Sequence, residues 1–459
     1  MQATDTIENR TFDEIEVGDS ASLERRLTSS DIKLFAVMSG DVNPAHVDED
    51  YAKSSRFHEI IAHGMWGASL ISTVLGTELP GPGTIYLGQT LRFRRPVRLG
   101  DVVTVTVAAR EKDPDRHRIV FDCRCTNQEG EVVIAGEAEV MAPTEKVRRP
   151  RAVLPQVRLA ERAHLHALLE ASAELAPLRV AVVHPAAGAA LRAALEAAEA
   201  GLATPLLVGP EHKIRAAADA EGIDIAPYRL VPTEHSHAAA REAVALARRG
   251  EVDALMQGSL ALTELLQAVL NAASGLRTER RLSHVYAFDV PTYPRLLLLT
   301  DAGIHVTPTL EHKRDIVQNA VGLAQAIGIT QPKVAILSAL EQVTPRIPST
   351  LDAAALCKMA ERGQISGGVL DGPLAFDDAV SAQAESRVVS AVSGRADVLV
   401  VPDLESGSML AEQLQHLGDA EAASIVLGAR VPILPATPEE AGIARLASLA
   451  LATLAARGT

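Results

Sequence analysis

The chain has 459 residues, of which 47% are hydrophobic and 22% charged, and its formal net charge is −14. A chain of this length usually forms two or three domains, and its acidic balance argues against a general nucleic-acid-binding role, which needs a basic surface. The polar N-terminal stretch MQATDTIENR has no apolar signal region, and no apolar run reaches the roughly 18 residues of a membrane span. We therefore expect a cytoplasmic protein with neither nucleic acid nor membrane as a partner.

The three cysteines predict neither a disulfide framework nor a metal site. Cys123 and Cys125 lie two residues apart on an expected strand, and Cys357 lies on an expected helix. The sequence has no CxxC pair and no His/Cys cluster with the spacing of metal ligands. This pattern is typical of a protein from a reducing compartment, and we expect no metal.

Residues 1–143 contain strand patterns and one prominent helix. The helix candidate, Ile60–Leu75, is apolar nearly all round, which predicts a buried helix. One buried helix against a long antiparallel sheet is an α+β arrangement. The strand candidates, the last two joined by the polar turn NQEG, are Ile85–Phe93, Val102–Arg110, His117–Thr126 and Glu131–Met141.

A segment rich in proline and basic residues, Ala142–Gln156, separates two parts of the sequence with different patterns of expected strands and helices. It reads as a solvated interdomain linker, with a basic docking patch as the alternative. We place the domains at residues 1–143 and 158–459, with a linker at 144–157. The second domain alternates short apolar runs with alanine-rich helices, which predicts a mostly parallel, doubly covered sheet in two lobes.

The run SGDVNPAH, from Ser39 to His46, combines turn-forming residues with an acid and an imidazole. Pro44 stiffens the bend, and Gly40 permits a close approach of the backbone to a ligand. Asp41 and His46 together provide the groups of general acid–base catalysis near neutral pH. The alternative is an Asx-turn at Asp41, a helix cap at Asn43 and an ordinary surface histidine.

A wider pattern favours the catalytic interpretation. The run FAVMSGDVNPAH (residues 35–46), followed by Asp48 and Tyr51, resembles the motif of MaoC-like, (R)-specific enoyl-CoA hydratases, and the resemblance continues through IAHGM (61–65) and IYLGQ (85–89). It covers nearly all of residues 10–143 and implies a hot-dog fold, in which a curled antiparallel sheet wraps one buried helix.

The resemblance also implies roles for individual residues. Asp41 and His46 would form the catalytic dyad, with Asn43 orienting the water or the dyad. Ser72 would support Asp41 from the helix, and Gly64 would present its backbone N–H to the thioester carbonyl. Which of Asp41 and His46 takes a proton, and which gives one, stays open.

The basic residues that follow the IYLGQ segment (85–89) are candidates for binding the phosphates of coenzyme A. Arg92 and Arg94, with Arg95 and Arg98, have the required charge; solvated strand positions are the alternative. We expect His58 and His63 to be structural.

The second domain resembles the phosphate acetyl/butyryltransferase family, whose members exchange an acyl group between coenzyme A and inorganic phosphate. The resemblance runs from about Arg179 to Ala456 and rests on segments such as LRTERRLSH (276–284), KRDIVQNA (313–320) and GVLDGPL (368–374). It implies binding of acyl-CoA and phosphate.

Some family positions differ in this chain. Members commonly carry a Lys-Gly-x-x-His-Thr stretch, at which this sequence has Gln257 and Ala261, and a Ser-Arg pair near the C-terminus, at which it has Thr437-Pro438. Arginine holds phosphate bidentately, so its loss bears on transferase activity. The remaining candidates for binding substrate are Arg277, Arg280, Arg281, Asp301 and Thr437. For the arginines the alternative is a basic surface turn. For Asp301, and for Asp371, which also follows an apolar run, the alternative is a cap or turn role.

Together these features predict an α+β hot-dog domain followed by a two-lobed α/β domain like a phosphate acyltransferase. The expected activity is (R)-specific hydration of trans-2-enoyl-CoA, with phosphate acyltransfer as a further activity of the second domain. The alternatives are a hydratase whose second domain only dimerises or presents acyl-CoA, and a non-enzymatic acyl-CoA-binding regulator. We expect no cofactor beyond the coenzyme A thioester, and a homo-oligomer, dimer or higher.

Overall fold

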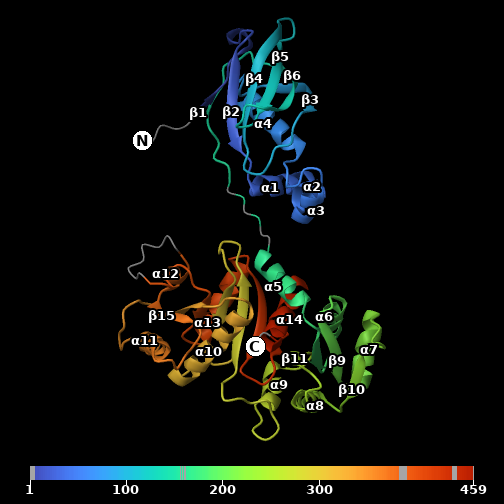
Figure 1. The fold of residues 1–459 in the computed structure, drawn as a ribbon, viewed down its shortest axis with the longest axis vertical. Coiled ribbons are helices and arrows are strands. Elements are labelled where there is room, and N and C mark those ends of the chain that lie inside the picture. The colour runs from blue at the N-terminus through green and yellow to red at the C-terminus, as the bar shows by residue number, and fades with distance from the viewer. Residues whose placement is uncertain are drawn as a thin grey trace. The chain divides into compact units, whose positions relative to one another are not determined.

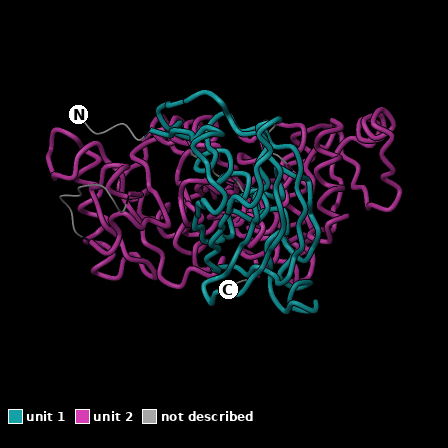
Figure 2. The backbone as a smooth tube through the Cα atoms, turned by 90° about the horizontal axis from the view of Figure 1, so that it is seen from above, with its two compact units in different colours: residues 1–159 teal, residues 160–459 magenta. Residues whose placement is uncertain are grey.

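A computed structural model describes residues 6–155, 157, 159, 162–381, 390–436 and 442–457. The chain divides into two compact units, Met1–Leu159 and Ala160–Thr459, which are coloured separately in Figure 2. None of the helices in these described ranges is long and apolar enough to cross a membrane.

The first unit contains a five-stranded antiparallel sheet in the order β2-β4-β5-β6-β3. Buried and less buried residues alternate along β4 and β5, the pattern of a sheet with one face on a core. The four predicted strands are all present, with ends shifted by three residues or fewer. The bounds are β2 Ser20–Arg26, β3 Ile85–Phe93, β4 Val102–Asp113, β5 Arg118–Thr126 and β6 Val132–Met141.

One long helix, α4 (Gly64–Thr77), lies against this sheet (Figure 1). Its buried face, including Trp66, Ile71 and Leu75, shares a hydrophobic core with residues of β4 and β5 such as Phe121. The prediction of a helix from residue 60 that is buried all round is wrong. The helix begins at Gly64, and its other face, which carries Met65, Ser69 and Ser72, is exposed because the sheet covers only one side.

Three short helices connect β2 to α4: α1 (Ser29–Ser39), α2 (Pro44–Val47) and α3 (Glu49–Ser54). The start of α1 has a capping box between Thr28 and Asp31, and the helix ends at Gly40, whose φ of 75° is the left-handed conformation that glycine adopts without strain. Side-chain caps also begin the next two helices. The polypeptide between α1 and α3 is thereby held in a defined bend.

The expected linker is only partly a linker. β7 (Arg148–Pro150) pairs antiparallel with β1 (Thr6–Glu8), and the side chain of Asn9 donates to the backbone carbonyl of Glu145 at 2.8 Å and accepts from Val147 N at 2.9 Å. Residues 144–150 therefore pack with the first unit, because backbone pairing along the basic segment satisfies its amides despite its charge.

The second unit is built on an eleven-stranded sheet in the order β10-β9-β8-β11-β18-β17-β12-β13-β16-β14-β15. The prediction of a mostly parallel sheet is confirmed, with one difference. The pairs β18–β17, β17–β12 and β12–β13 in the middle are antiparallel, and a block of parallel strands lies on each side. The bounds are β8 Leu178–Val183, β9 Ala203–Gly209, β10 Arg229–Pro232, β11 Ala254–Gln257, β12 Ser283–Asp289, β13 Leu297–Thr300, β14 Lys333–Leu337, β15 Val369–Leu374, β16 Val398–Val400, β17 Glu421–Leu427 and β18 Ile433–Leu434.

Helices cover the sheet, and the two parallel blocks form the two lobes (Figure 1). The core helix α14 buries Leu449 and Leu451 in the same cluster as Val285 of β12 and Val317 of α10. The bounds are α5 Ala163–Ala173, α6 Gly188–Glu199, α7 Glu211–Glu221, α8 Ser236–Arg248, α9 Leu262–Val269, α10 Leu310–Ala326, α11 Pro348–Glu361, α12 Phe376–Val380, α13 Leu404–His416 and α14 Gly442–Arg457.

Candidate active site

The bend between α1 and α2 places Asp41 and Asn43. Asp41 follows the left-handed Gly40, and its carboxylate accepts a hydrogen bond from the Asn43 backbone N–H at 3.2 Å. The Asn43 side chain accepts from Ala45 N at 3.1 Å, which caps α2 immediately before Pro44. Asn43 therefore fixes the bend through its capping oxygen, and its backbone N–H holds the carboxylate of Asp41; its predicted part in orienting the water or the dyad stays a prediction.

His46 is half-buried on α2, and its ring is oriented by the backbone. Nδ1 lies 2.9 Å from the carbonyl oxygen of Ile61. Because a carbonyl oxygen only accepts hydrogen bonds, Nδ1 carries the proton. In the neutral ring, Nε2 is therefore the nitrogen with a free lone pair, and it is available to accept a proton.

His63, which precedes the first residue of α4, is buried at 2% exposure. Its Nε2 donates to the backbone carbonyl of Asp41 at 3.0 Å. Its ring lies against the ring of His46, with centroids 4.0 Å apart, and against Phe35 at 5.0 Å. His63 thus links α4 to the bend and supports both other side chains.

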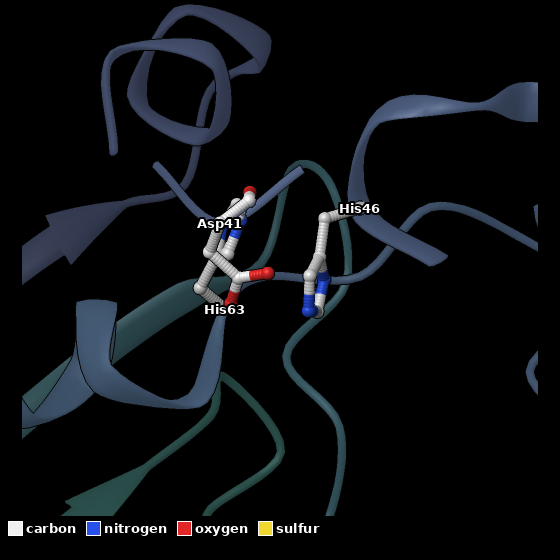
Figure 3. A group of neighbouring side chains, drawn as sticks. All are labelled: Asp41, His46 and His63. Atoms are coloured by element: carbon white, nitrogen blue, oxygen red, sulfur yellow. Dashed lines mark hydrogen bonds between the residues drawn. The ribbon is translucent and has the colours of Figure 1, made fainter. Parts of the chain in front are cut away.

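These three side chains converge (Figure 3). One carboxylate oxygen of Asp41 and one ring nitrogen from each of His46 and His63 lie within 4.8 Å of one another. A single water molecule, with hydrogen bonds of about 2.8 Å, spans two acceptors at such a separation. Although sequence spacing indicated no ligand cluster, the fold brings an acid and two imidazoles to one point.

A cavity of about 260 Å³ lies beside the cluster. Its wall includes His46, His63 and Gly64, but the exposed side chain of Asp41 is not part of it. Most of the remaining wall is apolar, and it also contains three arginines, so the cavity combines an apolar lining with cationic groups. The remaining lining residues are Ile61, Ala62, Gly67, Phe57, Phe93, Pro96, Val97, Ile134, Arg56, Arg94 and Arg95.

Gly64 provides the backbone N–H at the start of α4. The first N–H groups of a helix have no partner within the helix, and no side chain caps this one. A Cβ at Gly64 would lie 3.0 Å from Cε1 of Phe93 in the cavity wall. The missing side chain therefore leaves room for a ligand oxygen to approach the amide.

Ser72 and the arginines differ in how they relate to the cluster. Ser72 is exposed on α4, eight residues after Gly64, which places it about 12 Å along the helix. Among the described residues no hydrogen bond joins Ser72 to Asp41, so its predicted support of Asp41 has no counterpart here. Arg94 lines the cavity, whereas Arg92 is exposed and does not. Sequence reasoning missed Arg56, whose guanidinium lies 4.6 Å from the ring of Phe57, because no motif marks it.

In the second unit, Asp301 follows β13 and is buried at 2% exposure. Its Oδ1 accepts from the backbone N–H groups of His284, Gly303 and Ile304, and its Oδ2 lies 2.6 Å from Nδ1 of His305. Both oxygens are thus engaged within the protein, which agrees with the turn-forming alternative. Burial lowers the pKa of His284 to about 4, so that ring is neutral at pH 7.

Among the described residues, no hydrogen bond or ion pair joins the other predicted substrate-binding residues to Asp301. Arg277, Arg280 and Arg281 are exposed; Arg280 lines a surface cavity near α10, and the backbone N–H of Arg281 donates to Asp315 at 3.1 Å. One carboxylate oxygen of Asp371 accepts from the Gly372 backbone N–H, and the other is buried and has no hydrogen bond among the described residues. Thr437 and Pro438 lie outside the described residues.

Gln257, where the family resemblance expects lysine, joins two loops. Its Nε2 donates to the Leu260 carbonyl at 2.8 Å, and its Oε1 accepts from Ala436 N at 3.0 Å. It borders a cavity of about 320 Å³ at the ends of β11 and β18, which is lined mainly by alanine, leucine and methionine. Arg445, the cationic residue among the lining residues, forms an ion pair with Glu196.

The fold and these two sites define a chain of two enzyme-like units, a hot-dog unit with an acid–histidine cluster and an α/β unit with a cleft between strand ends. The family model "MaoC like domain" matches residues 14–129, and the model "Phosphate acetyl/butaryl transferase" matches residues 233–438. The chain belongs to the phosphate acetyl/butyryltransferase family and carries a MaoC-like domain before the transferase domain.

Individual proteins are similar to parts of this chain. The chain is 53% identical to a phosphate acetyltransferase from Rhizobium meliloti over 289 residues, which is 62% of this chain and 92% of the relative. It is similar to the crystal structure of a branched-chain phosphotransacylase from Enterococcus faecalis, with a TM-score of 0.54, 26% identity and coverage of 61% of this chain and 99% of the other. An R-hydratase from Pseudomonas aeruginosa matches at 47% identity, with a TM-score of 0.33 and coverage of 34% of this chain and 99% of that chain.

Proposed function

We propose that the first unit adds water to trans-2-enoyl-CoA and forms (R)-3-hydroxyacyl-CoA. The observation that carries this proposal is the convergence of Asp41 and His46 beside an apolar cavity whose wall includes the N-terminal Gly64 of α4. An acid–base pair, a site for an acyl chain and a backbone donor are the parts that hydration of a conjugated thioester needs.

The reaction follows from these positions. The thioester carbonyl faces the Gly64 N–H, which stabilises the negative charge that develops on its oxygen. A water held between Asp41 and Nε2 of His46 gives a proton to one of these two groups as its oxygen bonds to C3 of the enoyl chain. The π component of the C2=C3 bond breaks, and its electron pair takes a proton at C2 from the other group of the pair. The C2–C3 single bond remains, and the elements of one water molecule are added in total.

Coenzyme A carries phosphates, and the cavity wall carries arginines to meet them. Arg95 is already paired with Glu131 at 3.2 Å, but Arg94 forms no ion pair with any residue in the described ranges. Arg56, which lies over the Phe57 ring, likewise has no ion pair among the described residues. Arg94 and Arg56 are therefore the wall arginines available to bind an anionic group.

The test is hydration of crotonyl-CoA by the purified full chain, followed as loss of enoyl absorbance. We expect activity in the wild type, a product that an (S)-specific 3-hydroxyacyl-CoA dehydrogenase does not oxidise, and a loss of about 10²–10⁴-fold in Asp41→Asn. Because Asp41 is exposed, this variant keeps its fold and its melting temperature. An Asp41→Asn variant with wild-type turnover, or an (S)-product, would refute the proposal. An inactive wild type would favour the non-enzymatic acyl-CoA-binding alternative.

A second candidate function, acyl transfer between coenzyme A and phosphate, is favoured by the family of the second unit. It is tested by phosphate-dependent release of free thiol from acetyl- or butyryl-CoA. Gln257 offers no positive charge, and both of its polar groups are used within the protein. We therefore expect slow release relative to a lysine-bearing relative, and complete absence of release would leave the second unit as an assembly or acyl-CoA-presenting module.

A further inference from the structure

The histidines of the Asp41 cluster have the hydrogen bonds of metal ligands. His46 Nδ1 donates to the Ile61 carbonyl, and His63 Nε2 donates to the Asp41 carbonyl. Metal-binding histidines almost always donate their second ring nitrogen to a carbonyl or carboxylate, which fixes the ring and its tautomer. The nitrogens left to bind an ion are Nε2 of His46 and Nδ1 of His63.

The Nδ1 atom of His63 provides a second, independent observation. It is buried and has no hydrogen-bond partner among the described residues, on a side chain with 2% exposure. Buried polar atoms in folded proteins usually have a partner. The ring that carries this unpaired nitrogen belongs to the cluster with Asp41 and His46, and a bound cation would supply the missing partner.

We propose that Asp41, His46 and His63 form a binding site for a divalent ion of the zinc class. Two imidazoles and one carboxylate are a ligand set that Zn²⁺ uses in sites that keep a fourth position open. In such a site, bonds of about 2.0–2.2 Å hold the ligand atoms roughly 3.3 Å apart. Here one carboxylate oxygen of Asp41 and one ring nitrogen of each histidine lie within 4.8 Å of one another. The Asp41 carboxylate is exposed and accepts one hydrogen bond, from the Asn43 backbone N–H, so a rotation of this side chain exchanges that bond for the ion.

The bound ion would occupy the groups that the proposed hydration needs. With Nε2 of His46 and the Asp41 carboxylate on the metal, neither accepts a proton from water, so Zn²⁺ would inhibit hydration reversibly. This consequence rests on the proposed function of the first unit, whereas ion binding itself does not.

The site is tested with the chelator-treated full chain, by Co²⁺ titration followed by visible absorption and by competition with Zn²⁺. We expect a tetrahedral Co²⁺ spectrum in the wild type, displaced by Zn²⁺, and affinity lowered at least about tenfold in both Asp41→Asn and His63→Asn. His58→Asn is the matched control. His58 is exposed and near the cluster in the sequence, and its φ of 62° suits asparagine, so its affinity stays at the wild-type value.

Each result decides for or against the site. A wild type without the Co²⁺ spectrum, or variants Asp41→Asn and His63→Asn that bind like the wild type, would overturn it. Since Asp41 is exposed, Asp41→Asn gives the decision even if His63→Asn does not fold. If crotonyl-CoA is not hydrated at all, the spectrum still tests the site; if it is hydrated, we expect inhibition at the Zn²⁺ concentrations that saturate it and recovery with chelator.

Discussion

A methyl group added at Gly64 tests the geometry of the proposed hydratase site. In Gly64→Ala the new carbon would lie 3.0 Å from Cε1 and 3.3 Å from Cδ1 and Cζ of Phe93. Carbon atoms normally approach to about 3.5–4.0 Å, so the ring has to shift by roughly half an ångström or more. The methyl group and the displaced ring also narrow the cavity beside the Gly64 N–H, so the substrate carbonyl is held away from this hydrogen-bond donor.

Loss of a single oxyanion donor commonly lowers kcat about 10²–10³-fold, and we expect this loss with crotonyl-CoA. The matched control is Gly76→Ala on the exposed side of the same helix, where a Cβ meets nothing within 4 Å. That variant should keep its activity and gain up to about 1 kcal/mol of stability. A Gly64→Ala variant with kcat within about threefold of the wild type would refute the assigned role of the amide.

Three further outcomes are expected. Arg94→Gln should raise KM for crotonyl-CoA several-fold with little change in kcat, and should weaken the salt dependence of KM. Arg92→Gln, outside the cavity wall, should change neither quantity. Equal effects of the two variants would contradict the role of Arg94 in binding coenzyme A. Burial lowers the pKa of His284 to about 4. Between about pH 6.5 and 4 the unfolded chain therefore binds more protons than the folded chain, so the unfolding free energy of the second unit drops by roughly 3 kcal/mol as the pH falls through that range. Denaturant titrations at several pH values should show a smaller pH dependence for His284→Asn. Gln257→Lys restores a charge whose loss costs about 2–5 kcal/mol in comparable dry sites, so it should raise phosphate-dependent thiol release, and an unchanged or lower rate would show that lysine is not what the cleft lacks.

The bend that carries Asp41 was predictable from the sequence because its determinants are local. Gly40, Asn43 and Pro44 each have a backbone preference that acts within a few residues, and the structure uses all three. The strands of the first unit were predictable for the same reason, since alternating burial leaves a period of two in the sequence.

The parts that sequence reasoning missed depend on contacts between distant residues. His63 lies seventeen positions after His46, and only the packing of α4 beside α2 brings their rings to 4.0 Å. The exposed face of α4 was misjudged because glycine, serine and methionine do not separate a buried face from an open one. The central antiparallel strands β12 and β17 were also not predictable, because strand direction depends on connections rather than on local composition.

The pairing of Thr6 with Pro150 places the first and the last strand of the first unit side by side in one two-stranded sheet. A domain whose two ends are adjacent can be excised or inserted into another protein without disrupting its hydrophobic core. The first unit can therefore be fused to other proteins, or excised from this one, with its hydrophobic core intact.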